Sequence, residues 1–142
     1  MKRSPLAHLA LLPLLIGVAA CTHTSGAGYQ AFVKQLRAAG ATVVEVSNNG
    51  TFPLSGDGHH ITVNGGWVEV YEYVTLQDAN ADAAHISADG STFRYGNSVS
   101  IYDGVLPNHF YKKDVLIVFY TGTDSQVLKL LTNLLGPQFA GG

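Results

Sequence analysis

Apolar residues recur at helical spacing, three and four positions apart, in three stretches of the chain. Helices are therefore predicted over residues 29–39, 76–86 and 125–135. The most continuous apolar stripe belongs to the last of them and consists of Val127, Leu128, Leu131, Leu134 and Leu135. Gly136 and Pro137 follow this stripe, in the order in which glycine and proline commonly end a helix.

Between the helices lie short runs of β-branched and aromatic residues, a composition typical of strands. Strands are predicted over residues 42–46, 60–63, 67–73, 92–95, 99–102, 109–112 and 115–120. Asn64-Gly65-Gly66 and Lys113-Asp114 stand where the chain turns back, which predicts two hairpins. The run from Val115 to Tyr120 is apolar at every position and predicts a central strand covered on both faces.

The order of these elements, α-β-ββα-ββ-ββα, predicts the fold class. Residues 29–142 are expected to form a single α+β domain with one antiparallel or mixed sheet. The helices should lie mainly on one face of that sheet. Two hairpin-then-helix units of similar length occur in the order, which suggests an internal duplication although their sequence identity is slight.

The first 28 residues follow a different pattern. Two basic residues at positions 2 and 3 precede an apolar run over residues 6–18, and two small residues end it. This run of 13 residues is shorter than the roughly 20 that a bilayer-spanning helix needs, and Pro13 would kink such a helix. A basic start, a short apolar run and a small-residue end predict a secretory signal peptide, cleaved after residue 20.

Val18-Ala19-Ala20-Cys21 resembles the lipobox of bacterial lipoproteins. The resemblance implies that the Cys21 sulfur carries a diacylglyceryl group and that the new amino terminus is often acylated too, with chains such as palmitate. Two or more acyl chains hold a protein stably on a membrane. The protein would thus be exported and anchored by lipid, facing outside the cytoplasm, with residues 21–28 as the lipidated cysteine and a flexible linker. The residues alone leave open an ordinary secretory signal that ends near a cysteine.

Three later stretches, FVKQLRAAGATV, HFYKKDVLIVFYTG and LLGPQF, are similar to stretches of small bacterial lipoproteins of unknown activity. The likeness spans most of the chain after Cys21. It implies a lipoprotein of the cell envelope and implies no activity. In lipoproteins of bacteria with two membranes, an Asp after the cysteine favours the inner membrane; Thr22 stands there, so either the cell membrane or the outer membrane is possible.

Charge and cysteine content narrow the function classes. Once residues 1–20 are removed, six basic residues remain against ten acidic ones. A domain with net negative charge repels the phosphate backbone of nucleic acids, so no nucleic-acid partner is expected. Cys21 is the only cysteine, so the exported domain has no internal disulfide and, if Cys21 is lipidated, no cysteine nucleophile.

Candidate catalytic and metal-binding residues are few. Ser55, Asp57 and His59 lie within one short loop, whereas the members of a catalytic triad usually come from separate elements. His59 and His60 are adjacent and would point to opposite faces of a strand. One open alternative is that His60 and His109 converge if the two hairpins pair. We predict no cofactor, no metal site and no enzymatic activity.

Glu72 is the carboxylate of greatest interest. It shares the strand face of Val68 and Val70, so it is buried if that face is core. A buried acid needs a partner, and Arg94, Lys112 or a tyrosine hydroxyl are the candidates. Such acids sometimes mark functional sites, and more often they lie at a sheet edge that water reaches.

The other face of the same strand carries three aromatic rings, those of Trp67, Tyr71 and Tyr73. If the helices cover the valine face, these rings form a possible binding surface for an unknown protein or small-molecule partner. The alternative places Tyr71 and Tyr73 in the core and leaves Trp67 at the rim. The sequence therefore favours a membrane-anchored, non-catalytic binding module. A structural or assembly component of the cell envelope is second, and a small enzyme with an acid and histidine site is third.

Overall fold

The computed structural model describes residues 27–47 and 49–142. The expected signal peptide, the expected lipidation site Cys21 and residues 22–26 of the expected linker lie outside these residues. The elements, in chain order, are α1 (Ala27–Ala38), β1 (Val43–Ser47), β2 (Asp57–Val63), β3 (Gly66–Glu72), α2 (Leu76–Ala84), β4 (Thr92–Tyr95), β5 (Ser98–Ile101), β6 (Asn108–Lys113), β7 (Leu116–Thr121), α3 (Ser125–Leu135) and β8 (Ala140–Gly141).

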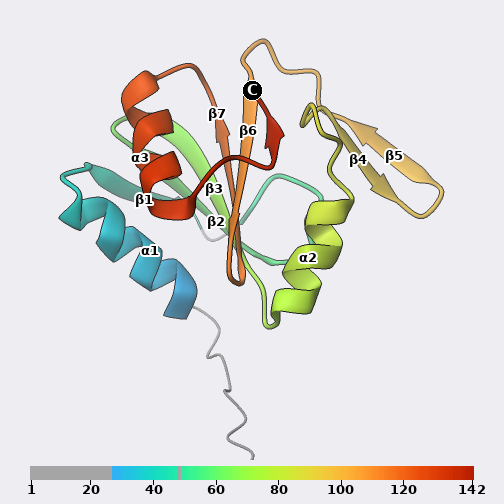
Figure 1. The fold of residues 1–142 in the computed structure, drawn as a ribbon, viewed down its shortest axis with the longest axis horizontal. Coiled ribbons are helices and arrows are strands. Elements are labelled where there is room, and N and C mark those ends of the chain that lie inside the picture. Colours follow the sequence, from blue (N-terminus) through green and yellow to red (C-terminus); the bar gives the residue numbers. More distant parts are fainter. Residues whose placement is uncertain (1–26, 48) are drawn as a thin grey trace, which may run out of the picture.

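A six-stranded sheet in the order β1-β2-β3-β7-β6-β8 forms the centre of the domain (Figure 1). The β2–β3 and β6–β7 hairpins are joined by antiparallel pairing of β3 with β7. Strands β4 and β5 form a separate hairpin. The predicted α+β class and element order are confirmed, and β8 is one strand more than the sequence predicted.

The sheet is covered on both faces. Helices α1 and α3 pack on one face, and Figure 1 shows α2 on the other side of the sheet. The loop of residues 51–56 and Phe93 of β4 complete the second layer. Strand β7 lies between β3 and β6, and its residues 116–120 are all buried. The prediction of a central strand covered on both faces is therefore confirmed.

Helix α1 begins at Ala27, two residues before the predicted start, because of a tertiary contact. The backbone N–H of Gly28 donates to Oε1 of the buried Glu72, at 2.8 Å. A carboxylate at the first turn satisfies a free N–H group and opposes the helix dipole favourably. Ala27 and Gly28 thus belong to the helix and not to the linker, and Glu72 holds the helix in place.

Other element ends differ from prediction by one to three residues. Strand β2 begins at Asp57 rather than His60, because its pairing with β3 continues as far as Asp57 opposite Glu72. Helix α2 ends at Ala84, and Ile86 instead forms an isolated bridge with Phe93. Among the described residues, every helix is too short or too polar to cross a membrane.

Candidate ligand-binding surface

Trp67 and Tyr71 of β3, and Tyr73 directly after it, have different environments. Their side chains lie on the sheet face opposite to Val68 and Val70, as the period of two requires. Tyr71 and Tyr73 are only 1% and 4% exposed, whereas Trp67 is 47% exposed. Of this predicted surface, Trp67 alone is placed where a ligand can reach its ring, because the loop of residues 51–56 covers the two tyrosines.

A buried carboxylate fastens one end of this loop. Glu69 is fully buried and accepts hydrogen bonds from the backbone N–H of Thr51 at 3.0 Å and from the Thr51 hydroxyl. It also accepts from the Tyr71 hydroxyl at 2.5 Å, and that hydroxyl accepts the Phe52 N–H at 2.8 Å. Burial and the neighbouring carboxylate raise the pKa of Tyr71 well above its ordinary value. The Glu69 carboxylate therefore positions Phe52.

A second buried carboxylate fastens the other end of the loop. Asp82 of α2 accepts from the Ser55 N–H at 2.6 Å, from the Ser55 hydroxyl at 2.9 Å and from the Tyr73 hydroxyl at 2.9 Å. Burial is the main cause that raises the pKa of Tyr73 strongly, and the hydrogen bond from its hydroxyl to Asp82 is the second cause. The hydroxyls of Tyr71 and Tyr73 are thus hydrogen-bonded inside the protein, and the loop is held at both ends.

Two adjoining hollows, which we call the Trp67 groove, lie between this loop and the connection from β5 to β6. Their volumes are about 270 and 230 Å³, and Thr51, Phe52 and Tyr102 line both. The other residues of the larger hollow are Trp67, Glu69, Leu106, Phe119 and Thr121. The other residues of the smaller hollow are Pro53, Phe93, Ser100 and Ile101. The one charged side chain among these lining residues is Glu69, and its carboxylate is already hydrogen-bonded to Thr51 and Tyr71. The remaining lining is uncharged and mostly apolar, so the groove fits an uncharged ligand.

The rim of the Trp67 groove is apolar and open to solvent. Ile101 is 74% exposed and Leu106 is 49% exposed, and Tyr102 and Val105 are exposed beside them. The ring of Phe52 packs against that of Tyr102, with centroids 4.9 Å apart. A contiguous exposed apolar surface of this kind marks a binding site more often than scattered single residues do.

Sequence reasoning missed Phe52, Ile101 and Leu106. Phe52 and Leu106 lie in loops, where the periodicity of strands and helices gives no information about direction. Ile101 ends β5, whose four residues are all exposed, so the strand pattern alone does not say which face meets a ligand. The signal that was available is the presence of large apolar residues in segments rich in glycine, proline and serine. Such residues need a partner surface, either inside the protein or outside it.

The imidazole ring of His60 packs against the indole ring of Trp67. Their ring centroids are 3.2 Å apart with an interplanar angle of 57°, and His60 pairs across the strands with Glu69. Burial lowers the pKa of His60, and the Glu69 carboxylate opposes this effect in part. His60 therefore favours its neutral form and supports the indole ring from the side.

The structure separates the other candidate residues of the sequence. His60 lies on the sheet face of Glu69, whereas His109 pairs with Tyr120 on the opposite face, and β3 and β7 stand between their strands. The two histidines do not converge, and the described residues contain no cluster of three potential metal ligands. His59 stacks on Tyr29 of α1, with centroids 3.8 Å apart.

The Ser55-to-His59 segment does not form a triad. The Ser55 hydroxyl donates to Asp82 on the α2 side of the sheet. His59 faces α1 on the other side, where its Nε2 lies 3.6 Å from Asp57 Oδ2. Since the serine and the histidine lie on opposite sides, the hydroxyl proton has no path to the imidazole.

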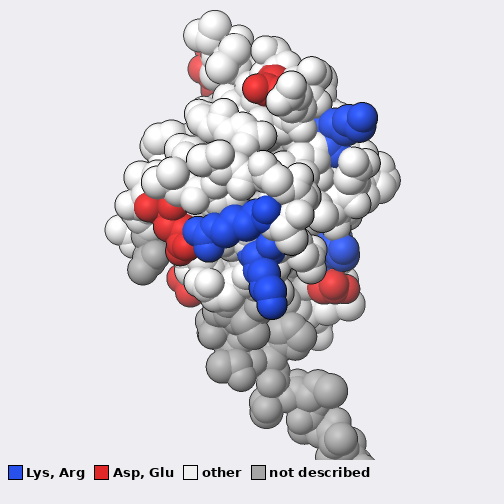
Figure 2. Space-filling view, turned by 90° about the vertical axis from the view of Figure 1, so that its left-hand side faces the viewer, with Lys and Arg blue, Asp and Glu red and all other residues white. Residues whose placement is uncertain are grey.

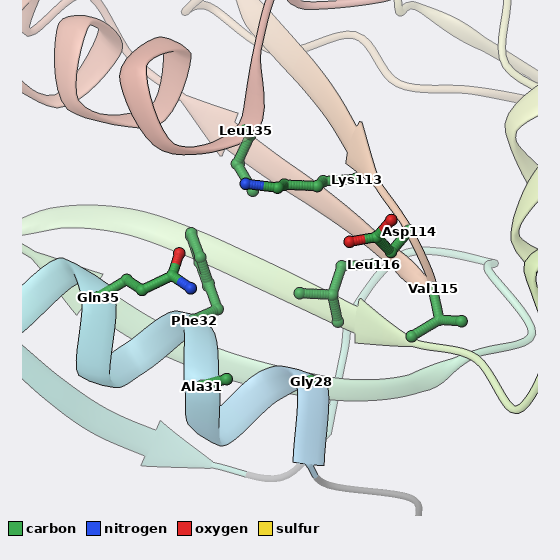
Figure 3. A pocket seen from close by; sticks show the side chains of 9 residues that line it. All are labelled: Gly28, Ala31, Phe32, Gln35, Lys113, Asp114, Val115, Leu116 and Leu135. Atoms are coloured by element: carbon green, nitrogen blue, oxygen red, sulfur yellow. The ribbon is translucent and has the colours of Figure 1, made fainter. Parts of the chain in front are cut away.

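A smaller pocket of about 130 Å³ lies between the start of α1, the β6–β7 turn and Leu135 (Figure 3). Lys113 and Asp114 stand at its edge, and the Lys113 ammonium donates to the Leu134 carbonyl at 2.7 Å. The cation is therefore engaged in closing the end of α3. The Trp67 groove offers the larger and more apolar space.

Charges on the α1 and α3 side are mixed. Figure 2 shows this side with basic and acidic side chains next to one another on a mostly uncharged surface. Arg37 and Glu45 form an ion pair at 3.2 Å, and both side chains are about half exposed. Exposed pairs of this kind contribute little free energy, and the mixed charges give no support to an anionic polymer as partner.

Comparison of the chain with protein-family models, with curated proteins and with solved structures finds no match.

Proposed function

We propose that this protein is a membrane-anchored lipoprotein of the cell envelope whose domain binds an uncharged, apolar ligand in the Trp67 groove. The domain acts as a non-catalytic binding module outside the cytoplasm. Support for the anchor comes from Val18-Ala19-Ala20-Cys21 after a basic and apolar leader. Support for binding comes from the groove.

The observation that carries the binding proposal is the exposed Trp67 ring beside the Phe52 loop. This loop is already held in one position before any ligand binds. Glu69 and Asp82 hold the loop that carries Phe52 at both its ends. A preformed apolar wall costs little entropy when a ligand binds. Rigid aromatic rings also give a large contact area for few lost rotamers.

The position of the groove suits an anchored protein. Glu72, at one end of β3, contacts the start of α1, which is where the chain arrives from Cys21. Trp67 stands five residues earlier in the same strand, about 17 Å away at the rise of an extended chain. Figure 1 shows the connection from β5 to β6 at the opposite end of the domain from the start of α1. The groove would thus face away from the membrane.

A neutral apolar dye tests the groove. We expect N-phenyl-1-naphthylamine to bind the full chain in detergent and to protect Trp67, the only tryptophan, from quenching by acrylamide. Leu106→Ser should weaken dye binding several-fold. Leu76→Ser is the matched control, because Leu76 is 51% exposed and lies on α2 outside the groove. Equal dye affinity of the two variants would refute the groove as the binding site.

The anchor needs a separate test. We expect Cys21→Ser to leave uncleaved precursor or to release soluble protein in a bacterial host, because no sulfur remains to carry the lipid. Membrane fractionation and gel mobility measure both outcomes. A variant that fractionates and migrates like the wild type would show that the lipoprotein assignment is wrong, without any bearing on the groove.

A structural role in envelope assembly is the second candidate, and strand β1 favours it. This strand is at the edge of the sheet, and its Val44 and Val46 are both about half exposed. Unpaired edges with apolar residues can add a strand from another chain. An assembly role would give a crosslinked partner that depends on Val44 and no dye binding in the groove.

A further inference from the structure

The end of the domain at which α1 begins, which we call the α1 end, is built from three segments that contact one another. The backbone N–H of Gly28, in the first turn of α1, donates to Glu72 at the end of β3. The backbone N–H of Tyr73, the next residue, donates to the carbonyl oxygen of Val115 in the β6–β7 turn, at 2.9 Å. Figure 1 shows the start of α1, this turn and the connection from β3 to α2 together at one end of the domain.

Two large apolar side chains are exposed at the α1 end. Val74 is 69% exposed and Leu76, the first residue of α2, is 51% exposed. Ala79 follows Leu76 by three positions, so the two share a helix face, and Ala79 is fully buried in the core. The apolar face of α2 therefore extends from the core to the exposed start of the helix.

The corner that carries these side chains, residues 74–76, is held in one conformation. Thr75 is the N-cap of α2, and its hydroxyl oxygen accepts the backbone N–H of Asp78 at 3.1 Å. The same hydroxyl donates to the Asp78 carboxylate at 2.7 Å. Tyr73, directly before the corner, is buried. Val74 and Leu76 thus stand on a preformed surface, which loses little conformational entropy when a partner covers it.

The place of Cys21 in the chain limits the distance from this corner to a membrane. Cys21 precedes Ala27, the first residue of α1, by six positions, and six residues span at most about 20 Å. If Cys21 is lipidated, its sulfur lies at the bilayer surface, and the start of α1 lies within that reach of it. The contact between Gly28 and Glu72 places residues 74–76 at the same end of the domain.

The charges at the α1 end do not favour head groups of one sign. Lys112 and Lys113 lie there together with three exposed carboxylates, those of Asp57, Asp78 and Asp114. Basic and acidic side chains in similar number give little net attraction to an anionic surface. A contact with lipid at this end therefore depends on apolar side chains, which gain free energy by leaving water.

We propose that residues 74–76 form a membrane-contact tip, which inserts the side chains of Val74 and Leu76 into the surface of the bilayer that holds Cys21. The inference rests on the lipid anchor of the proposed function and adds an orientation to it. An anchor on Cys21 limits only the distance of the domain from the membrane. A second contact at residues 74–76 sets the α1 end against the lipid and turns the Trp67 groove toward the space outside the membrane.

A fluorescent label at the corner tests this contact. Val74→Cys and Leu76→Cys are each labelled with a nitrobenzoxadiazole maleimide in the full lipidated chain, on vesicles of phosphatidylcholine. We expect iodide to quench these labels at least about threefold less than the label of a Val99→Cys variant, because iodide stays in the water and apolar tips enter the lipid. Val99 is the matched control, since it is 51% exposed and lies on β5, away from the α1 end in Figure 1. Nitroxide-labelled lipid should quench the two corner labels and leave the Val99 label unchanged.

The same samples separate failure of the tip from failure of the anchor. Equal iodide quenching of all three labels on vesicles that carry the protein would overturn the tip and leave the anchor standing. A chain that does not float with the vesicles in a density gradient would refute the anchor and the tip together. The wild type, whose only cysteine is Cys21, is the labelling blank. Because one fluorophore is used at every position, its own affinity for lipid does not explain a difference between positions.

Discussion

Removal of a single hydroxyl should loosen the wall of the Trp67 groove. In Tyr71→Phe the ring remains buried and its packing is preserved. The Glu69 carboxylate loses a donor at 2.5 Å, and the Phe52 N–H loses its acceptor at 2.8 Å. Both groups lie in the buried region beneath the loop, where water does not replace the lost partner at no cost.

The magnitude follows from these two losses. A hydrogen bond to a charged group contributes about 1.5–3 kcal/mol, and a buried donor left unsatisfied costs about 1–3 kcal/mol. Glu69 keeps its two bonds from Thr51, which limits the damage. We therefore expect the free energy of unfolding to fall by about 2–4 kcal/mol, out of a typical total of about 5–15 kcal/mol.

Urea denaturation followed by circular dichroism measures this change. Tyr111→Phe is the matched control, because Tyr111 is equally buried and its hydroxyl forms no hydrogen bond within the described residues. Tyr71→Phe should also increase acrylamide quenching of Trp67, since Phe52 is less firmly held. If the two variants differ by less than about 0.5 kcal/mol, the loop is not held by the Glu69 network and the groove is not preformed.

Two further outcomes test other parts of the fold. Leu131→Ala removes a fully buried side chain of α3 and should cost about 2–5 kcal/mol, whereas Lys129→Ala on the exposed side of the same helix should have almost no effect; similar melting temperatures would mean that α3 is not part of the core. Burial lowers the pKa of His60 below its ordinary value of 6.5, so the unfolded chain binds a proton at this residue more readily than the folded chain does. The free energy of unfolding should therefore fall as pH drops below about 6.5. His60→Gln should remove part of this fall in urea titrations at pH 7.5 and pH 5, and an unchanged pH dependence would contradict the assignment.

The helices and hairpins of the domain could be predicted because their causes are local. The apolar stripe that ends at Leu135 involves residues only three or four positions apart, so their spacing alone places them on one helix face. The Asn64-Gly65 turn likewise depends only on adjacent residues. The central position of β7 could also be predicted, because a strand with apolar residues on both faces must be covered twice. The start of α1 could not, since Ala27 and Gly28 join the helix through a carboxylate 44 positions away in the chain.

The aromatic face of β3 shows where this limit lies for the candidate site. A period of two places Trp67, Tyr71 and Tyr73 on one face of the strand, and the structure has them there. Which of the three rings meets solvent depends on the loop of residues 51–56, and its course is decided by Glu69 and Asp82. Spacing along one strand carries no information about a segment that arrives from elsewhere in the chain. The sequence therefore determined which rings share a face, and only the tertiary structure decided that Trp67 stays exposed, because burial is a property of contacts between distant segments.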